Sequence, residues 1–187
     1  ERLGADIIVI DGIKVYGPRG IAVLAVKDGT EIEPVTFGGG QERGLRPGTE
    51  DAGRIAGLSL ALEIGAKMRE KESKRLTQLR DYAIDKILKE ISGSSLNGSQ
   101  SERLPNNINI CFPGQDSEFL VIKLDTCGFA VSAASACQNI SGDNSSYVLE
   151  AIGKKECADS SLRITLGRQT RKSDLEKLIS ALKTIIK

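Results

Sequence analysis

Two short apolar runs near the start of the chain predict a pair of strands. They cover residues 5–10 and 21–26, and each leads into a turn that contains an Asp-Gly pair. Between the runs, residues 16–20 read Tyr-Gly-Pro-Arg-Gly, a composition typical of tight turns. The pattern therefore predicts two short buried strands joined by a tight loop.

A glycine-rich segment, residues 38–48, separates these strands from a long amphipathic stretch. Such glycine density is incompatible with a helix or an interior strand. Thr49, followed by Glu50 and Asp51, predicts a helix N-cap with acidic residues in the first turn. From residue 52 to 91 apolar positions recur at helical spacing, which predicts two consecutive helices or one long bent helix across a domain junction. Residues 67–80 mix charges of both signs, which is typical of a solvated helix face.

The second half of the chain alternates between strand-like and helix-like segments. Strands are predicted near residues 107–112, 129–131 and 162–166, and helices from Asp116 or Ser117 to about residue 124, from Ser145 to 152, and over 172–186. No internal repeat is evident. The alternation indicates an α/β or α+β fold.

Composition and charge exclude several classes of function. The chain has 187 residues, 40% hydrophobic and 27% charged, with a formal net charge of +1, so charge alone gives no basis for binding nucleic acid or an anionic membrane. No apolar stretch approaches the roughly 20 residues that span a bilayer. The chain begins Glu-Arg-Leu-Gly without a secretion signal, which predicts a cytoplasmic protein and an interior cut rather than a natural start.

The four cysteines, at positions 111, 127, 137 and 157, match no zinc-binding spacing. Because the chain contains no histidine, it cannot form a Ser-His-Asp triad. Without a secretion signal, a reducing compartment with free thiols is the simplest interpretation. At least one thiol could then be a nucleophile, and the others are expected to be small core residues.

Three residues are candidates for chemistry. Lys14 follows an apolar strand, where partial desolvation would favour an amine nucleophile, although a lysine beside a turn is usually a solvated charge. Cys137 lies in the small-residue run Ser-Ala-Ala-Ser-Ala-Cys-Gln, which suits a mobile thiol or simply tight packing. Arg163 interrupts an apolar alternating strand and needs either an anionic partner, such as a substrate carboxylate, or an outlet to water.

Four segments, in this order, resemble those of class V aminotransferase-type cysteine desulfurases. They are the lysine loop (residues 14–20), the glycine-rich segment (38–50), the catalytic cysteine loop (132–137) and the carboxylate-binding strand (160–168). Residues 103–107 and 145–149 are similar to further segments of that family. The resemblance spans essentially the whole chain.

The resemblance implies an α/β fold, the C-terminal portion of a fold-type I transferase dependent on pyridoxal 5'-phosphate (PLP). Lys14 would form the Schiff base with PLP and move protons at the substrate Cα. Cys137 would take sulfur from L-cysteine as a persulfide, leaving alanine, and Arg163 would hold the substrate carboxylate. Thr49 would reach the phosphate of the partner's PLP across a homodimer interface. A sulfur-acceptor or scaffold protein, serving iron–sulfur cluster or thiolation pathways, would be the partner.

Two positions depart from the family pattern Ser-x-His-Lys. Asp11 and Ile13 stand where a serine and a histidine help to bind the cofactor phosphate. The family's first half, which supplies most cofactor contacts, has no counterpart here, so we expect a fragment that is incomplete as a PLP enzyme. Residues 1–70 would end the large PLP-binding domain, and residues 71–187 would form the small C-terminal domain. The alternative is a noncatalytic sulfur-acceptor-binding module derived from a desulfurase; a transaminase-like or selenocysteine-acting relative is a variant within the family.

Overall fold

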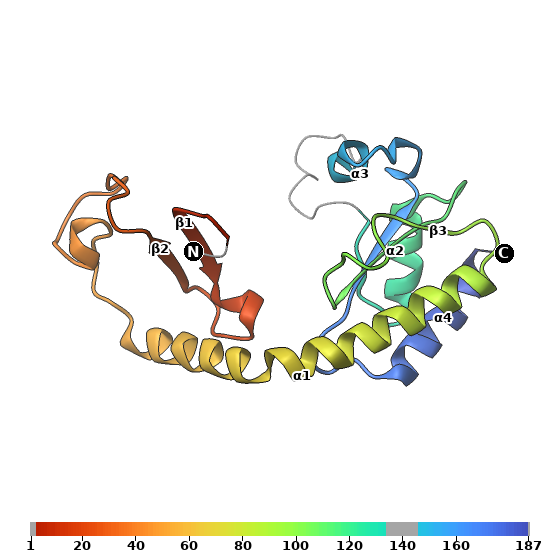
Figure 1. Ribbon diagram of the computed structural model, residues 1–187, viewed down its shortest axis with the longest axis horizontal. Coiled ribbons are helices and arrows are strands. Elements are labelled where there is room, and N and C mark those ends of the chain that lie inside the picture. Colours follow the sequence, from red (N-terminus) through yellow and green to blue (C-terminus); the bar gives the residue numbers. More distant parts are fainter. Residues whose placement is uncertain (1–2, 134–145, 187) are drawn as a thin grey trace. The chain divides into compact units, whose positions relative to one another are not determined.

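The computed structural model describes residues 3–133 and 146–186 and divides the chain into two compact units, Glu1–Arg69 and Glu70–Lys187. One helix, α1 (Ala52–Glu90), contributes its first part to one unit and its second part to the other (Figure 1). In the described part of the chain no helix is long and apolar enough to cross a membrane.

The first unit is built on an antiparallel strand pair, β1 (Ile7–Asp11) and β2 (Ala22–Val26), with Ile7 opposite Val26. Two short 3-10 helices, η1 (Gly12–Val15) and η2 (Glu42–Gly44), complete it together with the start of α1. The strand prediction is confirmed, but the expected burial is wrong. Val9 and Leu24 are 67% and 54% exposed, because a two-stranded pair offers little surface against which its apolar side chains can pack.

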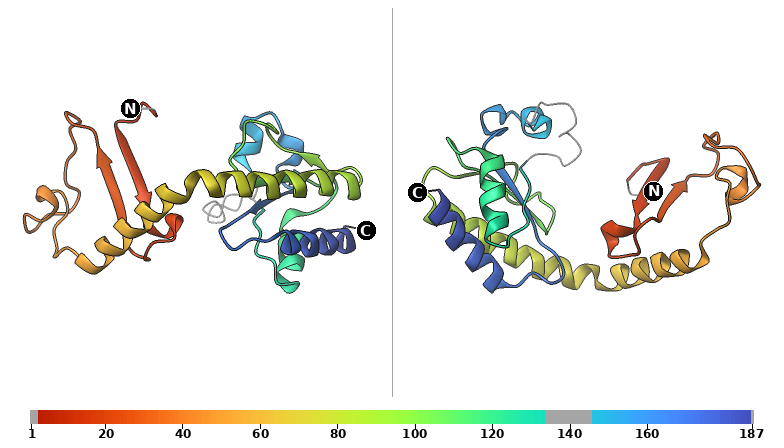
Figure 2. Two further views of the ribbon diagram at one scale, coloured as in Figure 1. Left: turned by 60° about the horizontal axis from the view of Figure 1, so that its bottom comes forward. Right: turned by 180° about the vertical axis from the view of Figure 1, so that it is seen from behind.

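The second unit contains a three-stranded antiparallel sheet in the order β3 (Ser95–Leu96), β4 (Asn107–Cys111), β5 (Ser161–Thr165). The second unit also contains the helices α2 (Ser117–Thr126) and α3 (Tyr147–Ala151), which lie between β4 and β5 in the chain, and α4 (Lys172–Ile185), which follows β5. A short 3-10 helix, η3 (Lys155–Cys157), precedes β5. The end of α1 and α4 lie side by side in Figure 2, and Lys183 of α4 forms an ion pair with Glu90 of α1.

One face of this sheet forms the core. Alternate residues of β4 and β5 point to the same side, and these are fully or almost fully buried against α1, α2 and α4. The core cluster includes Ile84, Ile87, Ile108, Ile110, Leu120, Leu124, Leu162, Ile164, Leu178 and Leu182. The opposite face carries Asn107, Asn109, Arg163 and Thr165, so the sheet is apolar towards the helices and polar on the other side.

Several predicted boundaries are confirmed and others need correction. Residues 52–90 form one helix. Its N-cap is Asp51 and not Thr49, because the Arg54 amide donates to Asp51 Oδ1. No strand forms over residues 129–131; pairing with β5 begins only at Ser132, through an isolated bridge. Asp116 caps α2 as expected. Ser145 lies outside the described residues, and Ser146 is the N-cap of α3.

Candidate active site

The lysine loop is a single 3-10 turn fixed directly onto the end of β1. Asp11 is its N-cap, and its carboxylate accepts a 3.2 Å hydrogen bond from the Ile13 amide. The turn ends at Tyr16, which has a left-handed backbone with φ of 62°, and the Gly17 amide closes it onto the Gly12 carbonyl at 2.8 Å. Lys14 lies in the last turn with its side chain exposed. The predicted location at a strand end is confirmed, whereas the desolvation expected for this amine is not present in the described chain.

Close packing against α1 holds this loop. A Cβ atom on Gly57 would lie 2.7 Å from Pro18 Cγ, and one on Gly17 would lie 3.4 Å from Ala61 Cβ. Gly12 is equally constrained, because a Cβ there would meet the carbonyl oxygen of Pro18 at 2.8 Å. Small residues on both elements are therefore what allow the helix to lie directly against the turn that follows Lys14.

The glycine-rich segment is an irregular loop whose shape depends on left-handed backbone. Glu42 and Arg43 have φ of 48° and 60°, which is uncommon for residues with a side chain. The Gln41 side chain helps to fold the loop back by accepting a hydrogen bond of 3.2 Å from the Gly48 amide. Thr49, at the end of the loop, is exposed.

Arg163 occupies the middle of β5 and is half-buried. Its amide donates to the Ser132 carbonyl at 2.7 Å, and the Ser132 amide donates to the Arg163 carbonyl at 3.1 Å. On the other edge of β5, Arg163 faces Asn109 of β4. No hydrogen bond or ion pair of the Arg163 guanidinium is formed within the described part of the chain.

A buried polar network adjoins Arg163 on the same sheet face. Asn97 is 2% exposed, and its amide nitrogen donates to Asn109 Oδ1 at 2.8 Å and to Ser161 Oγ at 2.9 Å. The Asn97 Oδ1 atom has no hydrogen-bond partner among the described groups. This network fixes the Asn109 side chain beside Arg163. Sequence reasoning missed it, although the alternation of Asn107, Ile108 and Asn109 was the available signal.

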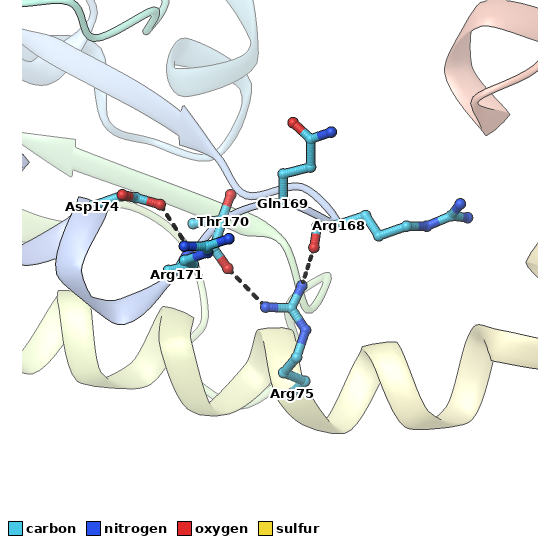
Figure 3. A pocket seen from close by; sticks show the side chains of 6 residues that line it. All are labelled: Arg75, Arg168, Gln169, Thr170, Arg171 and Asp174. Atoms are coloured by element: carbon cyan, nitrogen blue, oxygen red, sulfur yellow. Dashed lines mark hydrogen bonds between the residues drawn. The ribbon is translucent and has the colours of Figure 1, made fainter.

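A network of hydrogen bonds around Arg75 supports the turn after the strand that carries Arg163. Arg75 of α1 donates to the carbonyl oxygens of Thr170 at 2.8 Å and Arg168 at 3.2 Å, in the turn that follows β5 (Figure 3). It also donates to the carbonyl oxygen of Gly167 at 3.1 Å. Its guanidinium also forms an ion pair with Glu72, and the hydrogen bond from Arg75 lowers the pKa of Glu72. The side chains of Arg75, Arg168, Gln169, Thr170, Arg171 and Asp174 line an open hollow of about 650 Å³, which contains none of the predicted site residues.

The prediction of a solvated helix face over residues 67–80 is only partly correct. Arg80 is 5% exposed, forms an ion pair with Asp81 and donates to the carbonyl oxygens of Arg103 and Leu104. Arg103 in turn donates to Asn107 Oδ1 at 2.9 Å. Burial lowers the pKa of Arg103, and the nearby charge of Arg80 adds to that effect. These arginines hold the turn that leads into β4.

The cysteines depart from the expectation of four free thiols. Cys111 and Cys157 are buried as expected, but they form a disulfide bond. Their 46-residue separation carries no signal from which the pairing could be predicted. Cys127 is free and exposed, so it is not a core residue. Cys137 lies outside the described residues. Lys14 and Thr49 belong to the first unit, and Arg163 to the second.

The aminotransferase class-V family model matches residues 1–178, and the chain belongs to this family. Its curated relatives include the cysteine desulfurase IscS of Dictyoglomus turgidum, 43% identical over 187 residues, and the cysteine desulfurase IscS 1 of Archaeoglobus fulgidus, 42% identical over the same length. Both alignments cover 100% of this chain but only 47% and 48% of the relative. The chain therefore spans about half the length of these curated relatives.

Solved structures show the same fold. A NifS-like protein matches with a TM-score of 0.87 and 26% identity, covering 100% of this chain and 47% of that one. A NifS-like protein from Rickettsia africae matches with a TM-score of 0.85 and 31% identity, covering 98% and 48%. The α/β fold and the family predicted from the sequence are thus confirmed.

Proposed function

We propose that this chain is the C-terminal half of a PLP-dependent cysteine desulfurase, and that Lys14, Cys137, Arg163 and Thr49 act in the roles implied by the family resemblance. The observation that carries the proposal is the backbone bridge between Ser132 and Arg163. It attaches the start of the segment that contains Cys137 to the strand that carries the Arg163 guanidinium. A thiol and a carboxylate-binding cation on adjoining segments are what sulfur removal from an amino acid requires.

The described residues fit PLP only in part. Lys14 offers an exposed primary amine suited to an aldehyde, and Thr49 offers an exposed hydroxyl suited to a phosphate oxygen. Asp11 does not fit a phosphate, because its carboxylate is anionic and already accepts the Ile13 amide. When bound, PLP would supply the electron sink that stabilises negative charge at the substrate Cα. The remaining contacts would come from residues beyond this chain.

The chain's own residues would perform the following steps. Arg163 would bind the carboxylate of L-cysteine through two parallel hydrogen bonds and so fix the orientation of Cα. The Lys14 amine would remove and return protons at Cα. The Cys137 thiolate would attack the substrate sulfur, so that a sulfur–sulfur bond forms as the carbon–sulfur bond breaks, and Cβ would take up the proton that the Cys137 thiol released. The products, L-alanine and a Cys137 persulfide, together contain all the atoms of L-cysteine and the thiol.

The proposal extends to assembly and location. We infer a homodimer in which Thr49 reaches the partner's cofactor phosphate, a sulfur-acceptor or scaffold protein that removes the persulfide sulfur, and a cytoplasmic compartment. Iron–sulfur cluster assembly or thiolation would use that sulfur. Residues 1–70 would be the end of the large domain and residues 71–187 the small domain. The exposed apolar side chains of β1 and β2 are consistent with a larger sheet that continues beyond them.

A noncatalytic sulfur-acceptor-binding module is the second candidate. The observation that favours it is the acidic cap of the lysine loop, where Asp11 brings a negative charge three residues before Lys14. Such a module would retain the surface of the second unit without needing a cofactor. Retention of Lys14, Cys137 and Arg163 together favours the enzyme, because a scaffold has no use for all three.

An absorbance titration of the purified chain with PLP tests the enzymatic candidate. We expect a PLP absorbance band that depends on Lys14 and that shifts when L-cysteine is added. Lys14→Ala should abolish the band, whereas Lys27→Ala, at an exposed lysine paired with Asp6, should leave it unchanged. Equal spectra for the unmodified chain and Lys14→Ala would contradict cofactor binding by this chain alone, and the desulfurase assignment would then describe the longer protein and not this half.

A further inference from the structure

The buried polar network beside Arg163 has a fixed hydrogen-bond direction. The Ser161 hydroxyl donates to the carbonyl oxygen of Cys157 at 2.6 Å. The Asn97 amide nitrogen donates to Ser161 Oγ at 2.9 Å and to Asn109 Oδ1 at 2.8 Å. Ser161 and Asn97 are 1% and 2% exposed, so bulk water does not compete for these hydrogen bonds.

The direction originates at the carbonyl oxygen of Cys157, which can only accept. Because the Ser161 hydroxyl gives its one hydrogen to that oxygen, Ser161 Oγ can only accept from Asn97. Asn97 must therefore turn its amide nitrogen, and not its amide oxygen, towards Ser161. Asn109 contacts the same nitrogen, so the side chain of Asn109 must offer its oxygen.

The unpaired Asn97 Oδ1 atom shows that this direction is kept at a cost. This buried oxygen has no hydrogen-bond partner among the described groups, which is an unfavourable state for a polar atom. Flipping the amide would break both hydrogen bonds that its nitrogen donates. The backbone of Asn97 is also held, because its amide donates to the Asn109 carbonyl at 2.9 Å and its carbonyl accepts from the Arg103 guanidinium.

The amide nitrogen of Asn109 is therefore turned away from Asn97, on the sheet face that carries Arg163. Asn109 and Arg163 lie opposite each other on β4 and β5. The backbone hydrogen bonds of Arg163 go to Ser132, so the two residues form a non-hydrogen-bonded pair, in which cross-strand side chains are closest. A guanidinium and an amide nitrogen are both donors and cannot bond to each other. A group that binds to both must be an acceptor.

We propose that Asn109 is a second binding residue for the carboxylate that Arg163 holds, and that Asn97 and Ser161 are the positioning residues that make it a donor. This inference rests on the proposed function, because it concerns the same amino-acid substrate. A carboxylate has about four lone-pair positions on its two oxygens. Two parallel hydrogen bonds from Arg163 use two of these positions, and the Asn109 side-chain N–H uses a third.

The network also keeps Arg163 from acquiring an internal partner. With its amide turned the other way, Asn109 would present Oδ1 to the guanidinium, and this oxygen would compete with the substrate carboxylate. Asn97 occupies that oxygen instead. The buried hydrogen bonds therefore supply a donor to the ligand and at the same time withdraw a competing acceptor.

The first test is an NMR titration of the 187-residue chain with L-alanine, the proposed product, which has the carboxylate but no reactive sulfur. Side-chain signals of Asn109 and Arg163 report on the two donors separately. We expect both signals to shift with one dissociation constant, and neither to shift with L-alaninamide, which lacks the carboxylate. A shift at Arg163 without one at Asn109 would overturn the role of Asn109 and leave that of Arg163 intact. A shift at neither would overturn both roles.

The second test compares two substitutions of Asn109. Asn109→Ala should raise the dissociation constant for L-alanine by about threefold to tenfold, because one hydrogen bond to a charged group is lost. Asn109→Asp keeps the shape but should raise it by more than about tenfold, because the new carboxylate pairs with Arg163 and repels the ligand. Thr165→Val, at an exposed position on the same sheet face, is the control and should change nothing. Weakened binding in Arg163→Gln together with unchanged binding in Asn109→Ala would overturn the inference alone.

The third test concerns the positioning residues. Ser161→Ala removes the hydroxyl that fixes the direction of the Asn97 amide, so Asn109 can turn its oxygen towards Arg163. The dissociation constant for L-alanine should rise by about twofold to fivefold, although both binding residues are intact. Ser160→Ala is the matched control, at a buried neighbouring serine outside this network, and should bind L-alanine normally. If Ser161→Ala does not fold, Asn97→Asp, which offers an acceptor in place of the donor, should weaken binding in the same way. Affinity equal to that of Ser160→Ala in whichever variant folds would overturn the positioning role.

Discussion

The amide of Arg163 donates to the carbonyl of Ser132 at 2.7 Å, and the amide of Ser132 donates back to the carbonyl of Arg163 at 3.1 Å. Both backbone groups of Arg163 therefore point away from β4, so Arg163 and Asn109 form a non-hydrogen-bonded pair, the arrangement that brings cross-strand side chains closest. The backbone of Arg163 is fixed by Ser132 and its side chain lies beside Asn109, while its guanidinium forms no hydrogen bond or ion pair with the described residues.

An arginine kept for binding should be dispensable for folding. We predict that Arg163→Gln changes the free energy of unfolding by less than about 0.5 kcal/mol, because the guanidinium has no partner among the described residues. Arg80→Gln is the matched control and should cost about 2–3 kcal/mol, because it removes the hydrogen bonds that a buried guanidinium donates to two carbonyl oxygens. Urea unfolding measures both. A large loss in Arg163→Gln would indicate a structural arginine and count against the carboxylate-binding role.

Two of the glycines in the first part of α1, Gly57 and Gly65, should respond in opposite directions to alanine. A Cβ on Gly57 would lie 2.7 Å from Pro18 Cγ, so Gly57→Ala should destabilise the first unit by about 1–3 kcal/mol and displace the loop after Lys14. Gly65 has open space at its Cβ position, so Gly65→Ala should stabilise the helix by about 0.5–1 kcal/mol. Thermal unfolding followed by circular dichroism measures both changes. Similar stabilisation by both substitutions would show that the helix does not pack on the lysine loop.

The Glu72–Arg75 pair should make part of the stability depend on acid. The hydrogen bond from Arg75 holds the pKa of Glu72 below its ordinary value of 4.5, and the charges of Arg75 and Arg168 add to the effect. Because the folded-state pKa is the lower one, the stabilisation is complete above about pH 4.5 and is lost as pH falls through the folded-state value.

Urea unfolding at several pH values between 7 and 3 tests this dependence. Glu72→Gln should be less stable than the unmodified chain at pH 7, and the difference should shrink towards zero at the acid end. Glu63→Gln is the control, since Glu63 and Lys67 form an exposed pair whose removal should have a smaller effect. A difference between Glu72→Gln and the unmodified chain that stays constant from pH 7 to 3 would contradict the assignment.

Local patterning predicted most of the elements but not the contacts between them. The alternation at residues 107–112 predicted β4 because its apolar positions face the core. The pairing of Ser132 with Arg163, and of Cys111 with Cys157, joins residues far apart in sequence, and no local pattern specifies such pairs. The burial of Arg80 was missed for a similar reason, because its acceptors are carbonyl groups of a distant turn.

The candidate site stays a prediction that rests on family resemblance. Lys14, Thr49, Cys137 and Arg163 are individually ordinary residues, and what distinguishes them is the order and spacing of the segments around them. The support for Arg163, through Asn97, Asn109 and the Ser132 bridge, became visible only with the strand register in place. Neither α1 packing on the lysine loop nor the acidic cap formed by Asp11 could be derived from hydrophobic spacing.

Asp11 should weaken cofactor binding through its charge. Its carboxylate caps the turn that contains Lys14, the residue proposed to bind PLP, so its negative charge would oppose an anionic cofactor. Asp11→Ser keeps a good capping side chain and removes the charge, so it should lower the PLP dissociation constant by about threefold to tenfold, corresponding to about 1 kcal/mol of relieved repulsion. Absorbance titration at low salt measures the change, and the gain should diminish at high salt because ions screen the repulsion. Asp11→Asn retains the shape without the charge and should bind PLP equally well, whereas an Asp28→Ser control, outside this turn, should change nothing. Weaker PLP binding in Asp11→Ser than in the unmodified chain would show that the carboxylate supports the cofactor site instead of opposing it.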